Sequence, residues 1–172
     1  MDQPYTQFRQ AVGDLATRWH TSGLPSRQCL LEKAAELERL RHALNIHGIW
    51  YRSPSMITAT LDDGIGQGLE IIEQFAEAIG MRLIRLGLLQ TPVTILHACQ
   101  RHQPDFLGMT VLQFDTEADL HRIAKQVPQR TRIVAGGPVF SADRGFQERT
   151  GTDYAASNVA DFLRFMLTTH VD

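Results

Sequence analysis

The chain has few of the residues that mark secreted, membrane-spanning or nucleic-acid-binding proteins. Only two of its 172 residues are cysteines, Cys29 and Cys99, and they lie far apart. This usage predicts buried free thiols in a reducing compartment rather than a disulfide framework. Lys and Arg number 17 against 19 acidic residues, a net charge of −2 that favours neither nucleic acid nor a membrane surface as partner. No apolar run approaches the roughly 20 residues that cross a bilayer, so we expect a cytoplasmic protein.

Motifs for common catalytic chemistries are missing as well. There is no G-x-x-x-x-G-K-[ST] phosphate loop, and the cysteines and seven histidines do not have the spacing of a metal site. No Ser-His-Asp or Cys-His arrangement can be placed. The sequence therefore indicates no catalytic residue and no metal-ligating residue. Whether the chain is an enzyme stays open, and a carrier, sensor or accessory domain is favoured over a stand-alone enzyme.

The pattern of hydrophobic residues changes near residue 56. Residues 5–20 and 26–44 each carry an apolar stripe at helical spacing, and they predict a helical hairpin within residues 1–48 that Gly48 ends. Residues 49–55 are expected to form a linker. Over residues 56–172, five short apolar runs alternate with helical patterns. This alternation predicts an α/β domain with a five-stranded, parallel, flavodoxin-like sheet of order 2-1-3-4-5.

The predicted boundaries follow from the runs and from the residues that interrupt them. The expected strands are 56–61, 81–86, 105–112, 131–135 and 153–156. The expected helices after them are 68–79, 91–102, 115–126, 142–149 and 158–168. In such sheets, ligands bind beyond the carboxyl ends of the strands.

Two groups of residues stand at those predicted carboxyl ends. Residues 62–68 follow the first strand, and their glycines allow positive φ and the close approach of another group to the backbone. Thr110 and Leu112 end the third strand, and Gly136 and Gly137 end the fourth. Small residues at adjacent strand ends suit either tight packing or a slot for a flat, narrow group.

The first turn also has some features of a nucleotide-phosphate loop. The match to G-x-G-x-x-G is incomplete because Leu69 stands where the third glycine belongs. Asp62 and Asp63 would repel a phosphate. A nucleotide-binding enzyme is therefore kept only as an alternative.

These residues resemble a known family. From about Met56 to the end, the sequence resembles the cobalamin-binding domains of methionine synthase, corrinoid methyltransferase carriers and mutases. The family pattern is D-x-H-x-x-G, then S-x-L, then G-G. Here it becomes Asp63-Gly64-Ile65-Gly66-Gln67-Gly68, Thr110-Val111-Leu112 and Gly136-Gly137. The resemblance implies that Asp63, Gly64, Ile65, Gly66 and Gly68 approach the lower face of a corrin, and that Thr110, Leu112, Gly136 and Gly137 line a slot for its nucleotide tail.

The main departure from the family pattern is Ile65. The family histidine at this position ligates cobalt from below, and isoleucine cannot ligate a metal. The resemblance therefore implies a corrinoid-binding or corrinoid-derived module without a histidine lower ligand. It would act with a partner protein (a methyltransferase, a radical enzyme or a regulator) in methyl transfer or sensing.

Two questions stay open beside this hypothesis. A regulatory or interaction domain of the same fold could bind heme or no cofactor. The N-terminal helices could cap the site, or they could form a homodimer interface.

Overall fold

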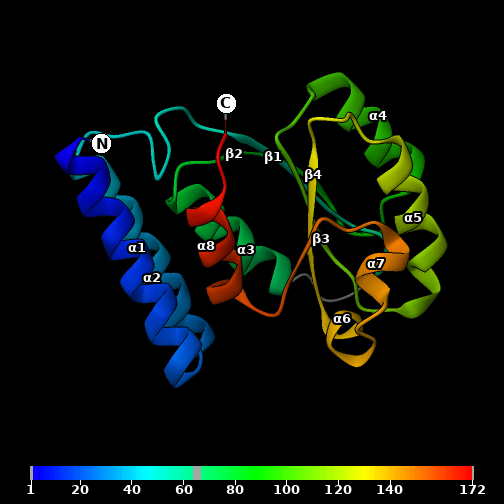
Figure 1. Ribbon diagram of the computed structural model, residues 1–172, viewed down its shortest axis with the longest axis horizontal. Helices are drawn as coiled ribbons and strands as arrows, with labels where there is room; N and C mark the ends of the chain where they lie inside the picture. Colours follow the sequence, from blue (N-terminus) through cyan, green and yellow to red (C-terminus); the bar gives the residue numbers. More distant parts are fainter. Residues whose placement is uncertain (1, 64–66, 172) are drawn as a thin grey trace. The chain divides into compact units, whose positions relative to one another are not determined.

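The structure, a computed structural model, describes residues 2–63 and 67–171 (Figure 1). Its elements, in chain order, are α1 (Gln3–Ser22), α2 (Arg27–Ala43), β1 (Ser55–Thr60), α3 (Gln67–Ala78), β2 (Arg82–Gly87), α4 (Pro92–His102), β3 (Phe106–Thr110), the 3-10 turn η1 (Phe114–Thr116), α5 (Glu117–Gln126), β4 (Arg132–Gly136), α6 (Pro138–Ala142), α7 (Phe146–Thr150), β5 (Tyr154–Ala156) and α8 (Val159–Thr168). They form two compact units. Residues 1–54, 70–82 and 158–172 make the first, and residues 55–69 and 83–157 make the second.

The second unit is built on the sheet. Its strand order is β2-β1-β3-β4-β5, and β3 pairs in parallel with both β1 and β4. This confirms the predicted flavodoxin-like order. Because β1, β3 and β4 are parallel and in register, their carboxyl ends come to one edge of the sheet.

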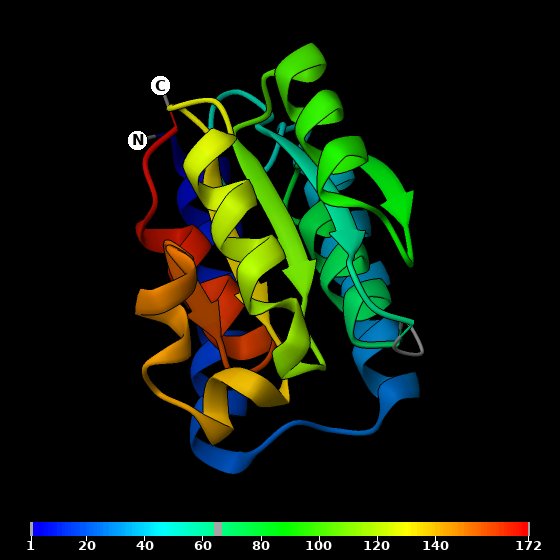
Figure 2. The same ribbon diagram turned by 90° about the vertical axis from the view of Figure 1, so that its right-hand side faces the viewer.

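Two helices cover one face of this sheet. Figure 2 shows α4 and α5 lying over the strands. The helix α4 begins where Thr91 caps it by accepting a hydrogen bond from the Thr94 N–H (3.1 Å), with Pro92 in the first turn. Alternate strand residues pack against the two helices in one hydrophobic core, which includes Ile57, Ala59, Ile95, Leu107, Met109, Leu120, Ile123, Ile133 and Ala135. The residues between them, such as Met56, Thr58 and Phe106, are buried too, as expected for central parallel strands.

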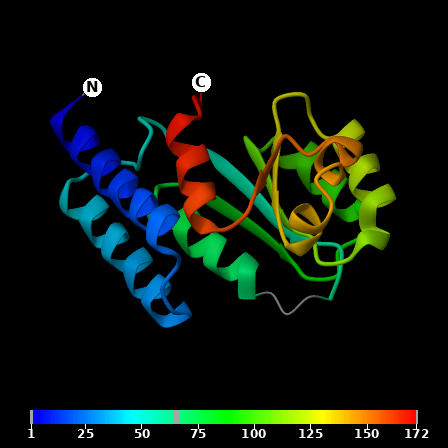
Figure 3. The same ribbon diagram turned by 60° about the horizontal axis from the view of Figure 1, so that its bottom comes forward.

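The first unit contains α1, α2 and α8 together with most of α3. The helix α1 packs along α8, and α1 and α2 run side by side (Figure 3). Phe8, Val12 and Ala16 on α1 are fully buried, and Trp19 meets the edge of Phe75 at 5.5 Å between ring centroids. These contacts give the predicted N-terminal helices an extensive core of their own.

Polar contacts fix the segment that follows α2. Arg9 donates to the Ile49 carbonyl (2.7 Å) and to the Leu167 carbonyl. The Trp50 indole N–H donates to the Thr169 carbonyl (3.0 Å). Ile49 and Trp50 are therefore tied to α1 and to the residue after α8, in a segment that the sequence predicted as a linker.

Three local predictions were wrong. The left-handed residue after α2 is Asn45 (φ 52°), and Gly48 instead lets the backbone approach Ile79, whose carbonyl oxygen would lie 2.1 Å from an added Cβ. One helix was expected over 142–149, but Asp143 is extended and separates α6 from α7. Cys29 is only half-buried, because it lies in the first turn of α2.

No helix in the described ranges is long and apolar enough to cross a membrane.

Candidate functional site

A row of small side chains crosses the sheet at its carboxyl edge. Thr60 is in register with Thr110, Thr110 with Gly136, and Gly136 with Ala156. Residues in register on neighbouring strands project from the same face. Their chain neighbours Ala59, Met109 and Ala135 belong to the core under α4 and α5, so this row lies on the opposite face. None of the four side chains extends beyond Cγ, and the row is therefore shallow.

The Gly136-Gly137 turn is held against the end of β3. The Val111 N–H donates to the Gly136 carbonyl at 2.8 Å. Gly137 has φ 126°, and an added Cβ would lie 2.0 Å from the Val111 carbonyl oxygen. The fold itself therefore requires glycine at position 137. At Gly136 an added Cβ would lie 3.0 Å from the Ala156 carbonyl oxygen, so this position admits no larger side chain without a shift.

Asp62 joins the ends of three strands. Its carboxylate Oδ2 accepts the Leu112 N–H at 2.9 Å, and its backbone carbonyl accepts the Thr60 hydroxyl at 2.8 Å and the Leu89 N–H at 3.3 Å. The side chain is only 5% exposed, yet Oδ1 has no hydrogen-bond partner among the described residues. Sequence reasoning missed this role because it treated Asp62 only as a charge beside Asp63. Its place two residues past the buried end of β1 was the available signal.

Exposed apolar side chains gather at the same edge. Among the described residues, six large hydrophobic side chains are well exposed, and four of them follow the ends of β2 and β3: Leu88, Leu89, Val93 and Phe114. Leu89 is 65% and Phe114 is 50% exposed. Phe114 rests edge-on against the buried Phe146 at 5.7 Å between centroids. Exposed apolar groups of this kind mark surfaces that bind a ligand or a partner.

The structure brings together most of the predicted site residues that it describes. Thr110, Leu112, Gly136 and Gly137 are half-buried and lie at the ends of β3 and β4. The Thr110 hydroxyl has no hydrogen-bond partner within the described part of the chain. Asp63 is exposed, and Gly68 lies in the first turn of α3 with nothing within 4 Å of an added Cβ. Gly64, Ile65 and Gly66 lie outside the described residues.

Side chains that ligate metals are sparse in the described part of the site. No group of three or more His, Cys, Asp or Glu side chains that could hold a metal occurs in the described ranges. The loops after β2, β3 and β4, residues 88–91, 111–115 and 137–140, contain no histidine, cysteine or methionine. These loops therefore offer no axial ligand for a heme iron.

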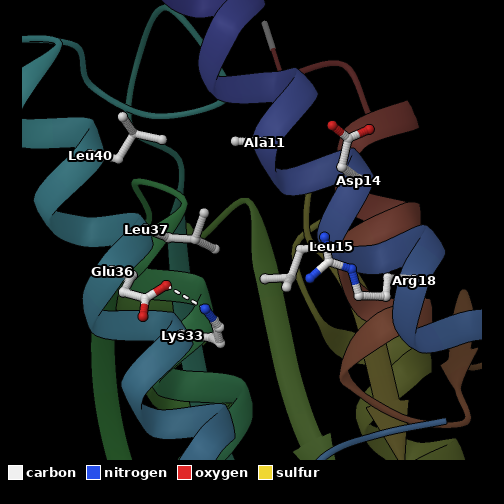
Figure 4. Close-up of a pocket in the computed structure, with 8 residues that line it drawn as sticks. All are labelled: Ala11, Asp14, Leu15, Arg18, Lys33, Glu36, Leu37 and Leu40. Atoms are coloured by element: carbon white, nitrogen blue, oxygen red, sulfur yellow. Dashed lines mark hydrogen bonds and ion pairs between the residues drawn. The ribbon is translucent and has the colours of Figure 1, made fainter. Parts of the chain in front are cut away.

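A second concave surface lies within the first unit. A cavity of about 320 Å³ opens between α1 and α2. Figure 4 shows its lining, in which Leu15 and Leu37 face each other across the groove, and charged side chains stand at its rim. Lys33 and Glu36 pair with each other at 2.7 Å. The full lining is Ala11, Asp14, Leu15, Arg18, Lys33, Glu36, Leu37 and Leu40.

Comparison with known proteins places the chain in a family. The model for the B12 binding domain matches residues 56–160, more than half of the chain. The fold with its parallel sheet and the match together show that this protein belongs to the B12-binding domain family. No curated protein matches.

Two solved structures share the fold. A novel cobalamin-binding protein from Desulfitobacterium hafniense DCB-2 is similar with a TM-score of 0.77 and 17% identity, over 94% of this chain and 79% of that chain. The monomethylamine corrinoid protein of Methanosarcina barkeri is similar with a TM-score of 0.63 and 13% identity, over 94% of this chain and 95% of that chain. Both matches extend beyond residues 56–160 and so reach into the N-terminal helices.

Proposed function

We propose that the chain is a corrinoid-binding module that holds cobalamin at the carboxyl edge of its sheet without a histidine ligand. It then presents the corrinoid to a partner protein in methyl transfer or sensing. The observation that carries this proposal is the row of Thr60, Thr110, Gly136 and Ala156, on the face opposite α4 and α5. Thr60 and Ala156 are buried and Thr110 and Gly136 are half-buried, and side chains this short suit a flat, narrow group such as a nucleotide base.

The residues around the row suit the rest of a corrinoid. Leu88, Leu89 and Phe114 offer exposed apolar surface to a large flat macrocycle and would exclude water beneath it. The unpartnered Thr110 hydroxyl can donate to the nucleotide tail or accept from it. When bound, the corrinoid supplies a cobalt centre that accepts and releases a methyl group. The chain's own residues bind and orient that group, and none of the described ones is placed as a general acid or base.

The first experiment tests the slot. The purified chain is incubated with hydroxocobalamin and desalted, and we expect corrin absorbance to remain with the protein. Thr110→Leu puts a larger side chain into the row and should raise Kd at least about tenfold. Thr17→Leu, on the exposed side of α1, is the matched control and should bind like the original chain. A wild-type chain that leaves the column colourless would overturn the proposal and favour a domain that works through its surface alone.

The second experiment tests the lower ligand. Ile65→His restores the residue that the family uses for cobalt, and it should convert the bound spectrum to that of a histidine-coordinated corrinoid and lower Kd. Ile65→Leu is the matched control, because leucine cannot ligate cobalt. If the two variants bind with the same spectrum and affinity, the residue at position 65 does not face the metal.

We also propose that the groove between α1 and α2 takes the same groove of a second copy. Its rim carries two acids, Asp14 and Glu36, and two bases, Arg18 and Lys33, so a two-fold pairing can set the acids of one copy against the bases of the other. Light scattering measures the molar mass as the protein is concentrated. Leu40→Glu, in the groove, should keep the chain monomeric, whereas Leu31→Glu, half-buried on α2 outside the groove lining, should not. A wild-type chain that stays monomeric at all concentrations contradicts this pairing.

A further inference from the structure

The one buried side-chain oxygen without a partner in the described part of the chain lies at the candidate site. We propose that this oxygen, Asp62 Oδ1, accepts a hydrogen bond from a peripheral carboxamide of the corrin and so selects amidated corrinoids over their carboxylate forms. The inference rests on the proposed function, because it assumes that a corrinoid binds at this edge. It adds a specificity-determining residue that no motif of the sequence identified.

The carboxylate is held in one orientation. Oδ2 accepts the Leu112 N–H at 2.9 Å, and the backbone carbonyl of the same residue accepts two further hydrogen bonds. Since one oxygen is fixed on β3 and the backbone is fixed on β1 and β2, Oδ1 cannot turn to another donor by simple rotation. A buried carboxylate oxygen without a donor is unfavourable, and a donor brought by a ligand would relieve that cost.

The chemistry of this oxygen decides which donor it takes. A carboxylate only accepts hydrogen bonds and carries negative charge. A primary carboxamide has two N–H donors and no charge, and corrinoids carry several such groups around the macrocycle. A phosphate or a carboxylate has no proton to give at neutral pH and would be repelled. A hard metal cation would need several oxygen ligands, and the described residues contain no group of three acidic, histidine or cysteine side chains to hold one.

Asp62 bonds residues of the edge that the corrin would cover, and because Oδ1 is itself buried, the ligand N–H must displace the groups that cover this oxygen. Asp62 is the second residue after β1, and Leu112 and Leu89, which bond to it, lie among the half-buried and exposed side chains of the same edge.

The test compares corrinoids that differ in one peripheral group. The probes are hydroxocobalamin and its monocarboxylic acids, each obtained by hydrolysing a single carboxamide, and the readout is Kd by absorbance titration of the full chain. The wild-type chain should bind one of these acids at least about tenfold more weakly than hydroxocobalamin. Asp62→Asn keeps the acceptor for Leu112 and places an N–H₂ at the Oδ1 position, so it should abolish or reverse that preference.

The control is Asp115→Asn, which removes the same charge from an exposed residue of the loop after β3 and should leave the ratio unchanged. Two outcomes overturn the inference in distinguishable ways. If the wild-type chain binds all the corrinoids equally, Asp62 does not select among them, and the proposed function stands. If the wild-type chain binds none of them, the proposed function falls and this inference falls with it. If Asp62→Asn keeps the wild-type preference, another residue makes the selection and the inference is overturned.

Discussion

Asp62 and Asp63 are adjacent in the chain after β1, but their burial and their contacts differ. Asp62 is buried and joins the ends of three strands, whereas Asp63 is exposed. Only the first of the pair accepts the Leu112 N–H. Asp62 can serve both the fold and a ligand. Its Oδ2 accepts the Leu112 N–H, and its Oδ1 has no partner among the described residues.

Gly137→Ala should destabilise the fold by roughly 3 kcal/mol, because alanine must adopt a φ of 126° and its Cβ would meet the Val111 carbonyl oxygen at 2.0 Å. Urea unfolding measures the change. Gly68→Ala is the stability control, since an added Cβ there meets nothing and helices favour alanine by about 1 kcal/mol. Equal effects of the two substitutions would contradict the close approach at Gly137.

The two thiols should react very differently. Burial raises the pKa of the Cys99 thiol to about 11, so at pH 8 only about one molecule in a thousand carries the reactive thiolate. Cys29 is half-buried at the start of α2. A thiol reagent at pH 8 should therefore add one label, at Cys29, and a second only in denaturant; intact-protein and peptide masses distinguish the sites. Fast labelling of Cys99 in the native protein would show that the core under α4 opens readily.

At the scale of elements, the segment after β4 is held by one arginine. The Arg149 guanidinium on α7 bonds both oxygens of Glu117 at 2.9 and 3.0 Å and reaches Asp143 at 2.6 Å. These bonds connect α5 with the loop between α6 and α7. The hydrogen bonds from Arg149 lower the pKa of the Glu117 carboxyl and that of the Asp143 carboxyl below their usual values. In this segment Phe146 packs edge-on against Phe114 and Phe140.

Arg149→Gln should make stability less dependent on acid pH. A carboxyl whose pKa is lowered in the folded state contributes stability above its unfolded pKa of about 4, and that contribution is lost as the pH falls through the folded value. The wild-type chain should therefore exceed the variant in thermal midpoint at pH 7, and the difference should shrink as the pH falls below about 4 and through the lowered pKa values. Arg144→Gln, on the same loop and exposed, is the control. A difference that persists unchanged in acid would mean that Arg149 acts through packing on Phe146 alone.

At the scale of the whole molecule, the N-terminal helices have a core of their own with α3 and α8. Phe8→Ala on α1 should cost about 3–5 kcal/mol, because its side chain is fully buried. Thr17→Ala, exposed on the same helix, should change stability by less than about 0.5 kcal/mol. Denaturant unfolding measures both. A negligible effect of Phe8→Ala would mean that α1 is a detachable appendage.

The division into a hairpin of residues 1–48, a linker of 49–55 and a domain of 56–172 stays a prediction about independent folding. In the structure, residues 70–82 and 158–172 group with residues 1–54. A fragment of residues 56–172 should therefore fold poorly, since α3 and α8 would lose the partners that bury Phe75 and the side chains of α8. Circular dichroism and thermal unfolding of the fragment check this, and a cooperative, native-like fragment would support the predicted boundary instead.

The sequence alone determined the order and type of the elements. Periodicity separates strands from helices, and the alternation of the two permits few topologies, so the parallel order 2-1-3-4-5 and the loops at its carboxyl edge were predictable. The position of Thr110, Leu112, Gly136 and Gly137 at adjacent strand ends was predictable for the same reason, whereas their role in binding was inferred from the family resemblance and stays a prediction.

Only the tertiary structure decided how those ends are joined. The bond from Leu112 to Asp62, the approach of Gly137 to Val111 and the break at Asp143 depend on which groups face one another across segments, and periodicity carries no such information. The close approach of Gly48 to Ile79 likewise depends on two distant segments meeting. Residue spacing along a chain specifies a face, but a contact between faces exists only once the chain has folded.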